Sequence, residues 1–176
     1  MFNFVIEDGM GVVGANSYLT LEDAENYFDS IGSDAWKEIC GDEDYAERKL
    51  VYASNFFDQR YGLGFRGEPV NPEQGMIFPL KICDKETGIP ANLKKAVLAL
   101  LDSLLQNGEL DHNANYEQAV KSESISLGNG ALVESKTYDN TMTNNISYYA
   151  VADKYVALLK KQFGATSSRF IPIYRA

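Results

Sequence analysis

Apolar residues recur every three or four positions in four stretches of this chain, a spacing that is typical of helices burying one face. The first stretch has a clear beginning, because Thr20 suits an N-cap and Asp23 can complete a capping box with it. Each stretch is followed by a glycine, which suits helix termination. The pattern predicts four helices, over about residues 21–31, 42–61, 90–107 and 145–163.

The third and fourth predicted helices carry the clearest core patterns. Pro90 suits the first position of the third helix, whose apolar residues are Leu93, Ala96, Val97, Leu100, Leu101, Leu104 and Leu105. In the fourth helix we expect a buried stripe of Tyr148, Ala152, Tyr155, Leu159 and Phe163, widened by Val151, Val156 and Leu158. A helix as apolar as the third is central to the fold or pressed against a partner.

Three other segments lack this long periodicity. Residues 1–17 are expected to form an extended lead-in, and a short helical piece is expected around Trp36. Residues 62–89 hold three of the five prolines and five of the fourteen glycines. This composition predicts a long irregular loop between the second and third helices.

The segment from Val120 to Tyr138 changes period around Gly128–Gly130 and predicts a β-hairpin. We expect Ile125 and Leu127 to face Ala131 and Val133. A hairpin with polar flanks is marginal alone, so it either projects to a neighbour by strand addition or is a plain solvent-exposed hairpin. The candidate contact residues are Ile125, Leu127, Asn129 and Val133.

The last twelve residues, 165–176, cannot continue the fourth helix through Pro172. They carry apolar side chains between two arginines, which suits a docking arm, although a frayed terminus without function remains open. The candidate arm residues are Arg169, Phe170, Ile171, Pro172, Ile173, Tyr174 and Arg175. We therefore expect a mainly α domain over residues 1–164, including the hairpin at 120–138, and a C-terminal docking arm over 165–176.

The composition fits one domain, because the chain has 176 residues of which 45% are hydrophobic. No apolar run approaches the roughly 18 residues of a membrane span, and the N-terminus lacks the pattern of a signal peptide. Cys40 and Cys83 have no framework spacing, so free thiols in a reducing cytoplasm are expected.

Charge divides the chain unevenly. Residues 1–60 contain 13 acidic and 4 basic residues, a net charge of −9, whereas residues 61–176 contain 12 of each. The excess suits a solubilising face or a surface that repels DNA, and a nonspecific nucleic-acid binder would carry the opposite charge. The expected acidic face comprises Glu22, Asp23, Glu25, Asp29, Asp42, Glu43 and Asp44.

The residue types that carry catalysis are scarce. The one histidine, His112, lies in a polar segment, and two distant cysteines complete no zinc set. Residues 42–44 lack the spacing of a calcium loop, and residues 62–67 follow a helix rather than the strand that precedes a phosphate loop. We expect no enzyme, no catalytic or metal-binding residue and no cofactor.

Several short motifs together resemble a family of phage proteins. They include Glu7-Asp8-Gly9, Ala15 to Thr20, Trp36, Phe78-Pro79 and Ile89-Pro90. Over roughly residues 6–105 the chain resembles the proteins labelled DnaT-like single-stranded-DNA-binding proteins. Relatives commonly have Trp-Pro-Arg where this chain has Phe78-Pro79-Leu80, so no role of that arginine carries over.

The same proteins are similar in size and helix order to the head–tail adaptors of tailed bacteriophages. This resemblance implies a four-helix adaptor-like bundle and a homo-oligomeric ring, of twelve copies, between the portal and the tail. It implies the portal and tail or neck proteins as partners, with double-stranded DNA passing without tight binding. The location implied is the virion neck, assembled in the host cytoplasm, with no membrane.

The alternative implied by the family label is a replication accessory protein that binds single strands through its C-terminal basic and aromatic residues. Single-stranded DNA binding needs a cationic track with aromatic platforms. Four cations, Lys160, Lys161, Arg169 and Arg175, beside a chain of net charge −9 make a poor clamp. The charge balance therefore favours the adaptor.

Overall fold

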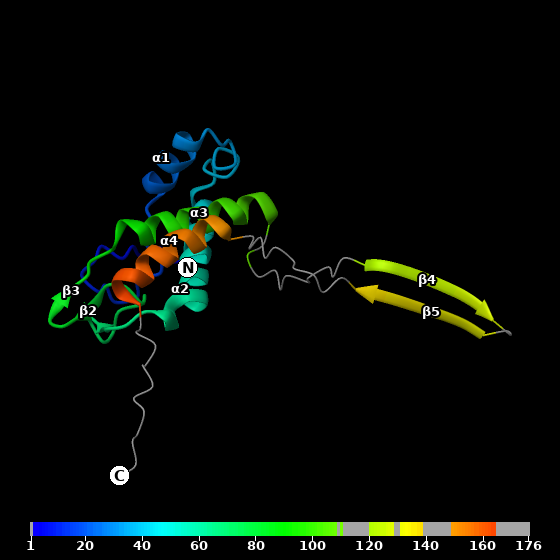
Figure 1. Cartoon of the computed structure of the whole chain (residues 1–176). Coiled ribbons are helices and arrows are strands. Elements are labelled where there is room, and N and C mark those ends of the chain that lie inside the picture. Colours follow the sequence, from blue (N-terminus) through cyan, green and yellow to red (C-terminus); the bar gives the residue numbers. More distant parts are fainter. Residues whose placement is uncertain (1, 109, 111–119, 129–130, 139–148, 165–176) are drawn as a thin grey trace, which may run out of the picture. The chain divides into compact units, whose positions relative to one another are not determined.

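Helices are the main elements of the structure, a computed structural model that describes residues 2–108, 110, 120–128, 131–138 and 149–164. The described chain is mainly helical, as predicted, and a small three-stranded antiparallel sheet accompanies the helices (Figure 1). The four α-helices found among these residues are α1 (Leu21–Ile31), α2 (Glu43–Tyr61), α3 (Ala91–Asn107) and α4 (Ala150–Phe163).

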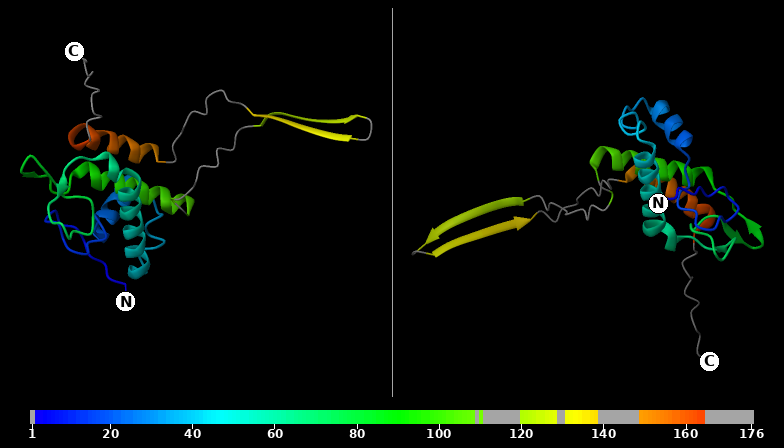
Figure 2. Two further views of the ribbon diagram at one scale, coloured as in Figure 1. Left: turned by 90° about the horizontal axis from the view of Figure 1, so that it is seen from below. Right: turned by 180° about the vertical axis from the view of Figure 1, so that it is seen from behind.

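The chain forms two units, which are described separately. The helical unit comprises Met1–Leu110 with Tyr149–Ala176, and the hairpin unit comprises Asp111–Tyr148. In the helical unit, α3 packs against both α2 and α4 (Figure 2). All the predicted core residues of α3 are buried except Leu105, which is half-buried. Helix α3 is therefore the centre of this unit.

The predicted capping box of α1 is confirmed. The Thr20 hydroxyl accepts a hydrogen bond from the Asp23 N–H (3.0 Å), and the Asp23 carboxylate accepts one from the Thr20 N–H (3.1 Å). The same carboxylate lies 2.8 Å from the Lys94 ammonium of α3. Asp23 thus satisfies a free N–H at the helix end and also ties α1 to α3.

The segment around Trp36 forms consecutive turns, so the helical piece expected there is wrong. Short hydrogen bonds such as Lys37 N–H to Asp34 O (2.9 Å) close these turns. The Trp36 ring is 3% exposed and stacks on Phe28 with centroids 5.8 Å apart. Packing of one aromatic side chain therefore holds the segment against α1 without helical periodicity.

The expectation of a wholly irregular loop over residues 62–89 is also wrong. A 3-10 turn, η1 (Gly62–Gly64), is followed by β1 (Glu68–Pro69), β2 (Leu80–Ile82) and β3 (Lys85–Glu86), ordered β1-β2-β3. Strands of two or three residues are too short to show an alternating pattern in the sequence. Pro90 precedes α3 as its N-cap rather than occupying its first position.

Helix α4 begins at Ala150 after the N-cap Tyr149, and the earlier start expected at 145–147, with Tyr148, lies outside the described residues. Ala152, Val156 and Leu159 are buried, but Val151 is 53% exposed and Leu158 is 44% exposed. The predicted widening of the stripe is therefore wrong for Val151 and Leu158. They project from α4 on the side away from the core.

The predicted hairpin is present as β4 (Val120–Gly128) and β5 (Ala131–Tyr138), which pair antiparallel. Its register pairs Leu127 with Leu132 and Ile125 with Glu134, while Val133 lies opposite Ser126. The facing of Ile125 and Leu127 with Ala131 and Val133 is therefore wrong by one position. Asn129 lies outside the described residues.

A buried carboxylate organises the N-terminal lead-in. Glu7 is 1% exposed, and its two oxygens accept hydrogen bonds from the N–H groups of Gly9 (3.0 Å), Gly11 (2.9 Å) and Val12 (2.8 Å). The lead-in is thus folded back on itself around this side chain. Asn71 continues the contact, donating its side-chain N–H to the Gly11 carbonyl (2.9 Å).

Glu7→Gln is expected to lower the free energy of unfolding by about 1–3 kcal/mol, because an amide NH₂ must replace one acceptor and face a backbone N–H. Urea denaturation followed by circular dichroism measures this loss. Asp8→Asn is the matched control, since Asp8 is exposed and accepts only the Met10 N–H (3.0 Å). Equal losses in the two variants would contradict the organising role of Glu7.

Candidate functional site

A hydrogen-bond network around Tyr18 joins three parts of the helical unit. The buried Tyr18 hydroxyl donates to Asp58 Oδ1 (2.7 Å) and accepts from the Phe78 N–H (3.1 Å). The second oxygen of Asp58 accepts from the Ile77 N–H (3.0 Å). The network therefore fastens the lead-in and the segment before β2 to the C-terminal half of α2.

Burial raises the pKa of Asp58 from its ordinary 3.8 to about 6, and the hydrogen bonds from Ile77 and Tyr18 oppose this rise. The folded pKa exceeds the unfolded one, so the folded state holds more protons between these values. The contribution of this carboxyl group to the free energy of unfolding consequently declines as pH rises from about 4 to about 6.

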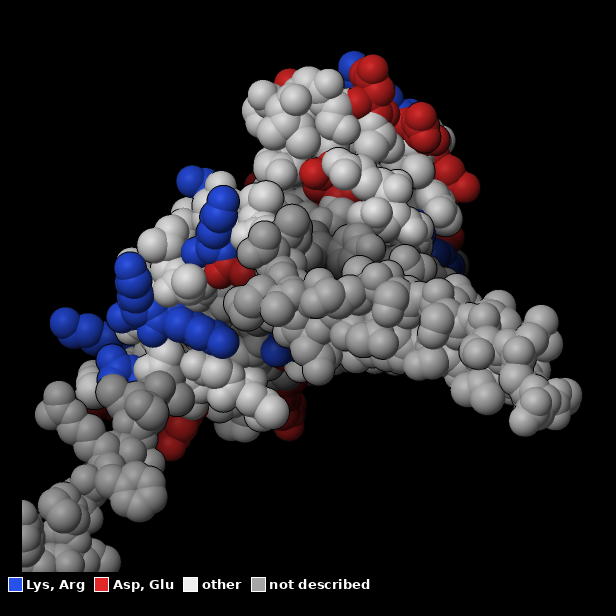
Figure 3. Space-filling view, turned by 45° about the vertical axis from the view of Figure 1, so that its right-hand side comes forward, with Lys and Arg blue, Asp and Glu red and all other residues white. Residues whose placement is uncertain are grey.

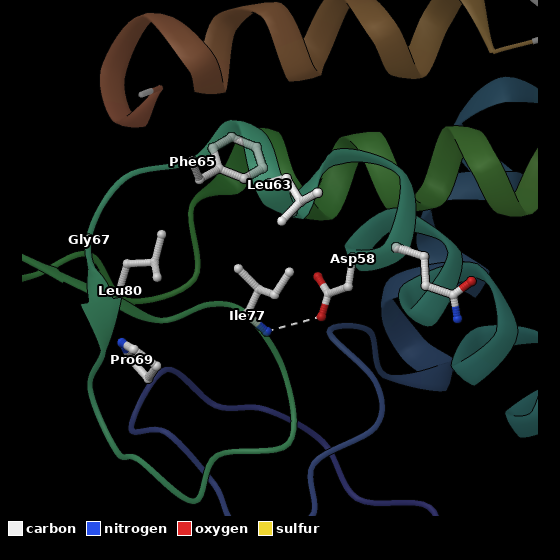
Figure 4. Close-up of a pocket in the computed structure, with 9 residues that line it drawn as sticks. Asp58, Leu63, Phe65, Gly67, Pro69, Ile77 and Leu80 are labelled. Atoms are coloured by element: carbon white, nitrogen blue, oxygen red, sulfur yellow. Dashed lines mark hydrogen bonds between the residues drawn. The ribbon is translucent and has the colours of Figure 1, made fainter. Parts of the chain in front are cut away.

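A groove of about 430 Å³ lies beside this network. Figure 4 shows Ile77 and Leu80 directed into it, Phe65 and Leu63 along one side, and the Asp58 carboxylate at one end. Leu63 is 99% exposed at the edge of this groove. The residues that line the groove are Asp58, Gln59, Gly62, Leu63, Phe65, Gly67, Pro69, Ile77 and Leu80.

The groove suits the binding of an apolar group better than catalysis. Asp58 is the one titratable residue in its lining, and both of its oxygens already accept hydrogen bonds from the protein. Catalysis by an activated nucleophile would need a nucleophile and a base within hydrogen-bond reach of each other. An apolar surface with one acidic edge offers a place for a mixed apolar and basic ligand.

A second surface, the α2 stripe, runs along one side of α2 and comprises Tyr45, Lys49, Tyr52 and Arg60. Tyr149, before α4, is buried and packs against Arg60. Tyr45 and Tyr52 are 44% and 42% exposed. The Lys49 ammonium lies 5.1 Å from the Tyr45 ring, and the Arg60 guanidinium lies 4.8 Å from the Tyr149 ring. These are distances of cation–π contacts, and the stripe interleaves basic and aromatic groups.

The predicted acidic face is only partly free. Glu22, Glu25 and Asp29 are exposed on α1, and Asp42 and Glu43 are exposed where α2 begins. Asp23 instead caps α1 and forms an ion pair with Lys94. Asp44 forms an ion pair with Arg48, with a distance of 2.8 Å between the charged groups. In Figure 3 acidic side chains gather at the top, where α1 lies in Figure 1, and most visible basic ones lie lower on the left.

Several predicted features cannot be placed. The docking-arm residues 169–175 and His112 lie outside the described residues, whereas Ile125, Leu127 and Val133 lie within the paired strands of the hairpin. Cys40 and Cys83 are free and exposed.

Two searches of the described part of the chain concern metals and membranes. In that part, no three His, Cys, Asp or Glu side chains lie close enough to hold a metal ion. No described helix combines the length and apolar composition of a membrane span.

The motif that carried the resemblance has a structural role. Asn16 accepts the Val5 N–H through its side chain (2.9 Å), and the Ser17 hydroxyl donates to the Leu19 carbonyl (2.8 Å). The Tyr18 N–H donates to the Ser54 hydroxyl on α2 (3.2 Å). The motif thus anchors the lead-in to α2, which makes it a signature of the fold.

Comparison with protein families decides the relationship. The model of the family described as "Putative DnaT-like ssDNA binding protein" matches residues 2–176. The chain belongs to this family. The match extends beyond the expected residues 6–105, so the hairpin and the C-terminal segment are included in it. No curated protein and no solved structure matches the chain.

Tyr18→Phe is expected to destabilise the protein by about 2–4 kcal/mol, because the Phe78 N–H loses its acceptor and Asp58 loses a donor. The pKa of Asp58 should rise above 6, since a hydrogen bond to the charged form is lost. Urea denaturation and a carboxyl-carbon NMR titration measure the two effects. With the exposed Tyr52→Phe as control, an unchanged Asp58 titration in Tyr18→Phe would contradict the network.

Proposed function

We propose that this protein is a structural subunit of a tailed-bacteriophage virion, a head–tail adaptor that forms a ring between the portal and the tail and continues the DNA channel. The observation that carries the proposal is the two-stranded hairpin, which forms a unit of its own. A subunit that builds a ring needs surfaces that are completed only by neighbours.

The hairpin supplies such a surface. Its strands of 9 and 8 residues pair only with each other among the described residues, so the backbone groups on their outer edges can accept another strand. A hairpin of two strands is marginally stable alone in water. Contact with a neighbouring copy, the portal or the next tail protein would stabilise it.

The two residues of the helical unit between which residues 111–148 are inserted lie close together. The Tyr149 hydroxyl donates a hydrogen bond to the Leu110 carbonyl within the helical unit. The chain therefore leaves and re-enters the helical unit at adjacent points. This hydrogen bond holds the two points together within the helical unit and involves no residue of 111–148.

The four helices are interpreted as an adaptor-like bundle whose outer α4 face meets a neighbouring copy. Val151 and Leu158 lie seven residues apart on that face, with Lys154 between them. Complete burial of a Val or Leu side chain contributes about 1.5–3 kcal/mol, and these two are already partly covered. One such contact is weak, so repetition around a ring of twelve copies would provide the avidity.

Charge supports passage of DNA without capture. The exposed acidic groups of α1 and the start of α2 repel phosphates, so a channel wall built from this protein would not grip double-stranded DNA. In this proposal the C-terminal arm, residues 169–175, docks on the portal, and tail or neck proteins are the other partners. The assembly takes place in the host cytoplasm.

Replacing residues 111–148 by a short Gly-Ser linker is expected to preserve cooperative unfolding of the helical unit and to abolish ring formation on the portal. Co-purification with the portal protein of the same phage and native mass spectrometry measure the second effect. Removal of residues 166–176 is the matched control, which should abolish portal attachment but leave contacts between copies. Ring formation by the linker variant at the level of the unaltered chain would contradict the role of the hairpin.

The second candidate function is a replication accessory protein that binds single-stranded DNA. The α2 stripe favours it, because aromatic faces and cations in alternation can stack bases and neutralise phosphates. The acidic residues Asp42, Glu43 and Asp44 lie at one end of the same stripe and oppose it. The adaptor therefore remains the preferred function.

Fluorescence anisotropy with a labelled oligonucleotide separates the two functions. The adaptor predicts no micromolar binding of single strands at physiological salt. Micromolar binding that weakens steeply with salt, and that is lost in a Lys49→Glu, Tyr52→Ala variant, would overturn the adaptor in favour of the accessory protein. Leu158→Ser is the control, because it changes an exposed side chain outside the stripe.

A further inference from the structure

The groove beside Asp58 is an apolar surface without a described occupant. Leu63 is 99% exposed at its edge, and Ile77 closes directly onto Gly62. A Cβ atom added to Gly62 would lie 2.0 Å from Ile77 Cδ1, so the end of the Ile77 side chain would have to move to make room for it. The groove is therefore shaped by close packing, while a large apolar side chain remains uncovered beside it.

The end of α4 lies at this groove. Gly164 pairs antiparallel with Phe65, a lining residue, and the Arg66 N–H donates to the Phe163 carbonyl (2.8 Å). Gly64 and Leu63, the two residues before Phe65, belong to η1, so Gly164 lies next to the turn that carries Leu63. Residues 165–176 thus begin beside the groove.

The sequence of residues 165–176 matches the lining in chemistry and in reach. Phe170, Ile171, Ile173 and Tyr174 are apolar or aromatic, and Arg169 precedes them. Phe170 stands six positions after Gly164, and an extended chain spans about 3.3–3.6 Å per residue, or roughly 20 Å in all. Phe170 can therefore reach any part of a groove that begins at Phe65.

We propose that this groove is the docking site of the chain's own C-terminal segment, residues 165–176, with Phe170 and Ile171 against Leu63 and Ile77 and Arg169 at Asp58. A carboxylate has about four lone-pair positions, and hydrogen bonds from Tyr18 and Ile77 occupy two of them. Asp58 can therefore accept a further bond from a guanidinium.

The segment of the same molecule is favoured over that of a second copy. A tether of a few residues gives an effective concentration of the order of millimolar, which a second copy in dilute solution cannot match. This docking does not depend on the adaptor function. If both proposals hold, residues 165–176 stay bound in the groove until the portal competes for them.

Methyl NMR of the full-length chain, labelled at Leu and Ile, tests the docking. Cross-peaks are expected between the Leu63 or Ile77 methyl groups and the side chains of Phe170, Ile171 or Ile173. In a triple variant, Phe170→Ser, Ile171→Ser and Ile173→Ser, these cross-peaks disappear and the Leu63 and Ile77 signals shift. The paired variant Val151→Ser, Leu158→Ser is the matched control, and it should leave the groove signals unchanged.

Leu63→Ser changes the groove instead of the C-terminal segment, so it tests the docking independently of the triple variant. It should shift the Phe170 ring signals. Absence of any contact between the segment and the groove in the unaltered chain would overturn the proposal. Cross-peaks that arise only between differently labelled molecules in a mixed sample would also overturn it, because the occupant would then be a second copy.

Discussion

The Tyr18 hydroxyl group is the point through which three distant segments of the helical unit are held together. It donates to Asp58 on α2 and accepts from the Phe78 N–H before β2, while Ile77 bonds the other Asp58 oxygen. Buried donors and acceptors are costly to leave unpaired. Movement of any one of these segments alone would break a buried hydrogen bond and is therefore disfavoured. Ile77, in the wall of the groove, is positioned by the same bonds.

The helices follow from the sequence because each rests on local signals. Thr20 and Asp23 define the start of α1, and the 3.6-residue period identifies the core of α3. The small sheet could not be predicted, since β1 and β3 have two residues each and depend on pairing with β2. The turns around Trp36 depend in the same way on stacking with Phe28, and the spacing of apolar residues in the sequence does not indicate this contact.

The functional surfaces were harder to predict than the fold because they depend on tertiary contacts. Composition indicates an acidic face, but only the structure shows that Asp23 is engaged with Lys94. The α2 stripe carries a detectable signal, the spacing of Tyr45, Lys49 and Tyr52, yet aromatic residues at this spacing are more often part of a core. The groove has no local signal, since residues from α2, η1 and β2 form it together.

The central functional claim is that copies of this protein close into a ring at the virion neck, and that the hairpin and the outer α4 face are completed there. The exposed acidic groups of α1 and of the start of α2, and a hairpin whose outer edges pair with no other described strand, fit such a role better than they fit capture of a polyanion. Cryo-electron microscopy of the purified virion tests the claim most directly. We predict density for this chain in a closed ring between portal and tail, and absence of the protein from purified particles would contradict the account.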